Sequence, residues 1–137
     1  MQAGQQPDSN PRNIKTGFSR VVIIVLLAEK VVQHIVVTVA FYLDFKGIAS
    51  TVVVDSRILM VAGALLAVFF ALSLWGMLSQ RGWAVNLAIL LAACDILGEF
   101  IAQGRLDIVI TVSFVVATIL FFVAIGYRRA VHRQLTG

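Results

Sequence analysis

Six polar side chains interrupt two otherwise apolar stretches, and they are the residues whose types could do chemistry. They lie in LLAEKVVQHIVV (26–37) and DILGEF (95–100): Glu29, Lys30, Gln33, His34, Asp95 and Glu99. Ionisable groups at membrane depth often mark an ion, proton or ligand path, and a histidine beside carboxylates suits a proton relay. The same groups can also pair simply to bury their charges and to fix which helices touch. Both interpretations stay open, and we favour pairing.

The composition places these residues in a membrane protein. The chain has 137 residues, of which 60% are hydrophobic and 13% charged, and its mean hydropathy is +0.95. The uncharged runs 58–78 and 108–127 are each long enough to cross a hydrocarbon core of about 30 Å as a helix. Neither run carries the recurring polar residues that the outer face of a soluble bundle needs. The sequence therefore predicts an integral membrane protein.

Apolar segments and turn residues divide the chain into four predicted helices. They run at about 18–43, 57–79, 82–103 and 107–129. Residues suited to helix ends stand at the joins: Asp55 or Ser56, Gly104 and Asp107. We expect an all-α, four-helix transmembrane bundle over 17–129, between a flexible cytoplasmic tail (1–16) and a basic cytoplasmic tail (130–137).

The distribution of Lys and Arg predicts the orientation. An even number of spans puts seven bases on one side: Arg12, Lys15, Arg20, Arg81, Arg128, Arg129 and Arg133. The other side has three: Lys46, Arg57 and Arg105. The positive-inside rule then places both termini in the cytoplasm, with the protein in the cytoplasmic (inner) membrane. Trp75 and Trp83 flank the short inner loop, as interfacial aromatics do.

This topology also explains the net charge of +4 without a nucleic-acid partner. The bases are those that the positive-inside rule retains at cytoplasmic ends, and no aromatic residues alternate with them to form a stacking surface. The partner that the sequence predicts is the lipid bilayer. A homo-oligomer or a larger membrane complex is left open.

The first and third helices need a partner inside the membrane. Their apolar residues favour insertion by about 5–9 and about 3–5 kcal/mol, and each ionised residue opposes it by about 2.5–3.5 kcal/mol. Lys30 with Glu29, and Asp95 with Glu99, bring each helix close to balance or below it. The uncharged runs of the second and fourth helices contain no ionised residue that opposes insertion. We therefore expect the first and third helices to pack face to face.

Helical spacing predicts which residues meet in that contact. Asp95, Glu99 and Gln103 follow an i, i+4, i+8 spacing, and Ala88 and Ala92 continue this stripe. At 1.5 Å of rise per residue, Asp95 reaches about the depth of His34, within reach of the longer Lys30 side chain. We predict that Asp95 pairs with Lys30, with His34 or with both. Glu29 and Gln33 share the neighbouring edge of the first helix, where Lys30 can serve Glu29 instead.

Further polar residues lie at the edge of this cluster. Glu99 and Gln103 continue the stripe outward, towards Thr38 and Tyr42. Arg105 follows closely enough to reach back to Glu99. These four neighbours of Glu99 are expected to be peripheral to the cluster.

Small residues on the second helix predict close helix approach. Ala62, Gly63, Ala67 and Ala71 occur at spacings that put small side chains together on the helix surface. Such residues let two backbones approach, either within the bundle or between protomers. Packing within one chain is the simpler expectation.

Other chemistry has little support. A haem at His34 lacks a second axial ligand in the chain, because His132 lies in the tail. A metal site made from His34, Asp95 and Glu99 has no recognisable spacing, and a hydrogen-bonded histidine explains His34 more simply. Cys94 lacks a neighbouring base, so we expect it to be buried and inert. No catalytic motif is present, and neither a cofactor nor a metal is expected.

In size and number of spans the chain is similar to small four-span bacterial families such as the phosphate-starvation-inducible PsiE group. The shared features are an acidic residue in the first span and GEFIA (98–102) in the third.

From the residues themselves we expect a non-enzymatic accessory, scaffold or self-associating membrane protein. The alternative is a small proton- or ion-coupled transporter or channel whose path is the polar cluster.

Overall fold

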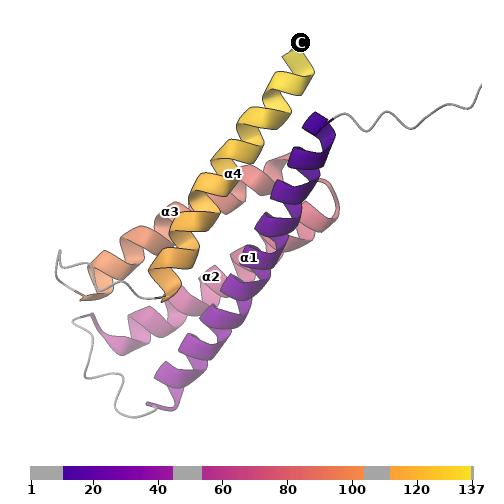
Figure 1. Ribbon diagram of the computed structural model, residues 1–137. Coiled ribbons are helices and arrows are strands. Elements are labelled where there is room, and N and C mark those ends of the chain that lie inside the picture. Colours follow the sequence, from indigo (N-terminus) through magenta and orange to yellow (C-terminus); the bar gives the residue numbers. More distant parts are fainter. Residues whose placement is uncertain (1–10, 45–53, 104–111, 137) are drawn as a thin grey trace, which may run out of the picture.

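The computed structural model describes residues 11–44, 54–103 and 112–136, and these form an all-α bundle, as predicted (Figure 1). The helices are α1 (Pro11–Tyr42), α2 (Ser56–Leu78), α3 (Gly82–Gln103) and α4 (Val112–Thr136). Each contains a segment long and apolar enough to span a membrane: Thr16–Tyr42, Ser56–Leu78, Gly82–Ile101 and Val112–Arg133. The chain is thus a small integral membrane protein of four spans.

The helices form a four-membered ring in which α1 and α3 are diagonal. α1 packs against α2 and α4, and α3 packs against the same two helices. Figure 1 shows α1 and α4 side by side in front of α2 and α3. The predicted face-to-face packing of the first and third helices is therefore wrong. Long side chains at the centre of a bundle can meet across the diagonal, so their contact does not require adjacent helices.

Small residues on the inner faces let the four helices come close. α3 presents Ala84, Ala88 and Ala92, all fully buried, and α4 presents Ala117 and Ala124. Bulkier buried side chains fill the remaining space: Ile23, Leu27, Phe70, Leu91 and Leu120. Without an apolar driving force between helices in lipid, such close van der Waals contact is a main source of association energy.

Within the described residues, the ends of the helices follow the expected capping chemistry. Asp55 caps α2, since its Oδ1 accepts a hydrogen bond from the Arg57 backbone N–H at 2.8 Å. α2 ends in a left-handed turn at Gln80 (φ 57°), where the Arg81 N–H reaches the Gly76 carbonyl at 2.8 Å. This bond is the long one of a Schellman motif. Gly104 and Asp107 lie outside the described residues.

Two helices extend beyond their predicted ends. α1 begins at Pro11, inside the segment expected to be a flexible tail, and α4 continues to Thr136 through the expected basic tail. Proline suits the first turn of a helix because its missing N–H would have no partner there. Arg133 in the last turn of α4 interacts favourably with the helix dipole. The start of α1 and the end of α4 lie at the same end of the bundle (Figure 1).

Candidate functional site: a charge network across the bundle

Lys30 is the centre of the polar cluster. Its side chain is completely buried, and Nζ lies 2.7 Å from Asp95 Oδ2. The same ammonium group donates to Gln33 Oε1 at 2.9 Å and to Ser113, at 2.8 Å for the carbonyl and 3.0 Å for Oγ. An ammonium has three N–H donors, and here every direction is occupied by an oxygen. Lys30 thus joins α1 to both α3 and α4.

Asp95 receives a second partner from α1. Nε2 of His34 lies 3.3 Å from Asp95 Oδ1, and the Asp95 side chain is only 6% exposed. The imidazole ring stacks on Phe70 of α2, with ring centroids 5.3 Å apart and planes 17° from parallel. The prediction that Asp95 pairs with Lys30, His34 or both is confirmed, with both. Through Phe70 the network touches all four helices.

Lys30 and His34 face the centre of the bundle because they lie on the inner stripe of α1. Buried Ile23, Leu27, Lys30 and His34 recur at helical spacing, so the two polar residues continue an apolar stripe towards the centre. A charge held there without a partner costs several kcal/mol. Opposite charges and hydrogen bonds offset most of that cost.

Glu29 and Gln33 have different surroundings. Gln33 accepts from Lys30, whereas Glu29 receives no hydrogen bond at its buried Oε2 from any residue that the structure describes. The idea that Lys30 serves Glu29 is therefore wrong, because Lys30 turns inward to Asp95. Glu29 and Gln33 instead line a hollow of about 500 Å³ on α1, with Val32 and Val36 among its walls.

The peripheral residues are only partly placed. Tyr42 is exposed, and Thr38 packs against α2 so closely that a Cβ at Gly63 would come within 2.8 Å of its Oγ1. Glu99 is half-buried. The Gln103 side chain and Arg105 lie outside the part of the chain whose side chains are described.

The small residues of α2 face two ways. Gly63 and Ala67 are buried and face the bundle, as expected for packing within one chain. Ala62 and Ala71 are exposed on the outer surface, so they do not take part in that packing. The helical turn of about 100° per residue accounts for Ala62, which precedes Gly63, but not for Ala71, which lies four residues after Ala67 and so on nearly the same side of the helix.

Cys94 differs from its predicted state, and the candidate metal ligands do not come together. Cys94 is exposed, which corrects the prediction that it is buried: the position before Asp95 points away from the bundle. Across the described residues, no three His, Cys, Asp or Glu side chains come together as a metal site. The His34, Asp95 and Glu99 combination is not such a group.

Two members of the network were missed from the sequence. Ser113 stands in the first described turn of α4, and its hydroxyl and carbonyl both bind Lys30. The only available signal was a hydroxyl residue within an apolar span. Phe70 gave no signal, because one phenylalanine among many apolar residues does not reveal a stacked histidine.

The fold and the network together define a four-span integral membrane protein with a buried ionic contact across its bundle. Compared with protein-family models, with curated proteins and with solved structures, the chain matches none of them. Its function is therefore argued from the site.

Proposed function

We propose that this protein is a non-enzymatic membrane bundle that acts as an accessory or scaffold subunit or by self-association. In this proposal the charge network is structural, and it determines which helices meet. The observation that carries it is the state of Lys30, whose side chain is 0% exposed and whose Nζ has oxygens at 2.7–3.0 Å on three helices. A group that transfers protons or binds a substrate needs access to water or ligand, and a saturated buried ammonium suits a fixed contact.

The proposal includes the orientation given by the charges, with both termini in the cytoplasm. A reporter fused after Gly137 tests this part alone. We expect activity typical of the cytoplasmic side. Activity on the opposite side would overturn the orientation and leave the role of the network untouched.

A second candidate function is a small proton- or ion-coupled transporter. It is supported by Glu29, whose buried Oε2 has no hydrogen bond to the described residues, and by His34 beside Asp95. A histidine beside a carboxylate can pass a proton, and intramembrane carboxylates are common in such relays.

Proteoliposomes distinguish the two functions. With a pH gradient imposed, a structural network predicts proton flux equal to that of protein-free liposomes. Flux that depends on the protein and disappears in Asp95→Asn, while circular dichroism shows an intact helical fold, would replace the first proposal by the second. Arg57→Gln, at an exposed position on α2, serves as the control and should change neither the proton flux nor the circular dichroism spectrum.

A further inference from the structure

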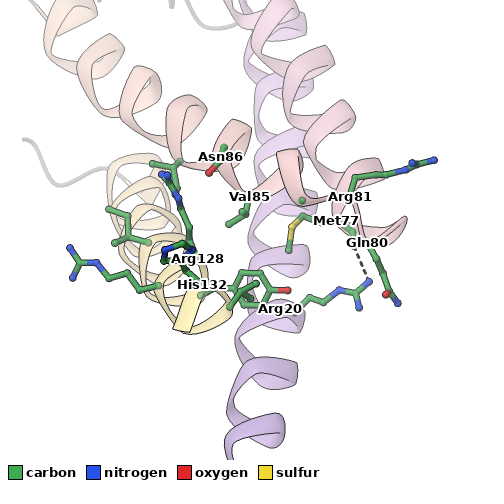
Figure 2. Close-up of a pocket in the computed structure, with 14 residues that line it drawn as sticks. Arg20, Met77, Gln80, Arg81, Val85, Asn86, Arg128 and His132 are labelled. Carbon is green, nitrogen blue, oxygen red and sulfur yellow. Dashed lines mark hydrogen bonds between the residues drawn. The ribbon is translucent and has the colours of Figure 1, made fainter. Parts of the chain in front are cut away.

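A second site lies at the end of the bundle that carries both termini. It is a pocket of about 830 Å³ whose walls come from the beginning of α1, the α2–α3 turn, the beginning of α3 and the end of α4. Figure 2 shows Val85 and Asn86 of α3 across from Arg128 and His132 of α4, with Arg20 of α1 nearby. The charge network of Lys30 and Asp95 is not part of it.

The pocket is strongly basic. Its basic wall residues are Arg20, Arg81, Arg128, Arg129 and His132, and none of the described residues that line it is an Asp or a Glu. Four arginines contribute to the wall of one opening, and an anion would offset this excess of positive charge, although the Arg81 side chain extends away from Arg128 (Figure 2). Arginine binds phosphate oxygens through two parallel N–H donors, so a phosphate group suits this set.

Apolar residues make up part of the pocket wall. Those that lie deeper along their helices than the arginines are Val85, Ile89 and Ile125, while Met77 and Val131 lie nearer the opening. These residues belong to α2, α3 and α4 and lie within their membrane-spanning segments. A pocket of about 830 Å³ falls in the range of about 300–1,000 Å³ that encloses larger organic ligands. Inorganic phosphate would leave most of this space and all of the apolar wall unused.

A pair of exposed tryptophans places the opening at the membrane surface. Trp75 and Trp83 lie beside the α2–α3 turn with ring centroids 6.5 Å apart, and both are substantially exposed. Exposed tryptophans gather at the boundary between headgroups and acyl chains. The arginines therefore stand at headgroup level, with Val85, Ile89 and Ile125 deeper in the membrane.

Arg20 is held in place before any ligand arrives. Its Nη2 donates to the Met77 carbonyl at 2.9 Å and to the Leu78 carbonyl at 3.3 Å, at the end of α2 (Figure 2). Both bonds use one nitrogen, which leaves Nη1 and Nε able to donate to a ligand. A fixed side chain loses less conformational freedom on binding.

We propose that this pocket binds an anionic phospholipid, with the headgroup phosphate among the arginines and the start of an acyl chain along the apolar wall. Basic pockets between membrane helices on the cytoplasmic side are suited to such lipids. The inference goes beyond the structural role of the charge network, and only the leaflet that it names rests on the proposed orientation.

The test measures lipid binding to the detergent-purified full chain by native mass spectrometry and thermal shift. The probes are phosphatidylglycerol, phosphatidylcholine with the same chains, glycerol phosphate and inorganic phosphate. We expect retention of phosphatidylglycerol and a rise in melting temperature with that lipid alone. A rise of equal size with either soluble phosphate would show an anion site without a chain site, and no preference over phosphatidylcholine would overturn the proposal entirely.

Matched arginine variants locate the binding. Arg128→Gln should weaken phosphatidylglycerol binding about fivefold, since one basic residue near an anionic headgroup contributes about 1 kcal/mol. Arg81→Gln, from the α2–α3 turn, should also weaken it. Arg133→Gln is the control, because Arg133 is an exposed residue of the same helix but not part of the pocket. Equal losses in Arg128→Gln and Arg133→Gln would mean attraction by overall charge and would refute the site.

Discussion

The charge network at mid-bundle and the basic pocket at the end use positive charge in opposite ways. Lys30 is 0% exposed and meets a carboxylate, an amide and a serine from within the same chain. The pocket gathers four arginines, and none of the described residues lining it is acidic. The first arrangement is complete by itself, whereas the second needs something from outside. Buried charge must be balanced internally, while charge at the membrane surface can be balanced by lipid.

The largest effect should come from removing the cation of the network. Lys30→Ala leaves Asp95 buried with only His34 beside it, so we expect a loss of about 3–5 kcal/mol of unfolding free energy. Reversible unfolding in mixed micelles, followed by circular dichroism, measures this loss. Arg57→Ala, an exposed cation of α2, should change stability by less than about 0.5 kcal/mol. Equal losses in the two variants would abolish the contrast between buried and exposed charge.

Replacing both members of the ion pair should restore most of that stability. In Lys30→Met with Asp95→Leu, similar volumes are kept and no charge is left unpaired. Buried pairs replaced in this way are often neutral or more stable, so we expect the double variant within about 1–2 kcal/mol of the natural protein. A double variant as unstable as Lys30→Ala in the same unfolding experiment would contradict a purely structural network.

Close packing, and not charge, should hold the corner that forms the pocket. A Cβ at Gly76 would lie 2.8 Å from the Ala84 Cβ and 2.7 Å from the Trp83 ring. Gly76→Ala should therefore cost about 1–3 kcal/mol. Gly98→Ala is the matched control on α3, since a Cβ there meets nothing within 4 Å. Thermal unfolding of the two variants should separate them, and a tolerated Gly76→Ala would show that α2 and α3 can move apart.

The smallest effect on stability should come from the pocket itself. In a neutral detergent without anionic lipid, Arg128→Gln should change the unfolding free energy by less than about 0.5 kcal/mol, because Arg128 is exposed. The same variant should lose part of the stabilisation that phosphatidylglycerol provides. A large loss in neutral detergent would mean that Arg128 is a structural residue and would remove the contrast with Lys30.

Much of the fold and part of the network were predictable because lipid imposes strict rules on sequence. The runs around Phe70 and Leu120 had to be spans, and the start of α3 at Gly82 was predicted as observed. Asp95 had to find a cation at its own depth, and Lys30 and His34 were the candidates. Ser113 could not be found in this way, because a serine costs little free energy in an apolar helix. Its position in the sequence therefore does not require a polar partner. Gly76 also gave no signal, because its role depends on where Trp83 and Ala84 fall after the turn.

The sequence by itself determined four spans, the need of α1 and α3 for polar partners, and the candidates for the central contact, which were Asp95 with Lys30, His34 or both. These follow from the free energy of placing each residue in lipid, which depends on composition and depth along one helix. Only the tertiary structure decided that α1 and α3 are diagonal, that Lys30 turns to Asp95 and Ser113 while Glu29 does not share it, and that arginines from three parts of the chain surround one pocket. Those outcomes depend on which helices are neighbours and on which way each side chain turns, and the helical period constrains neither.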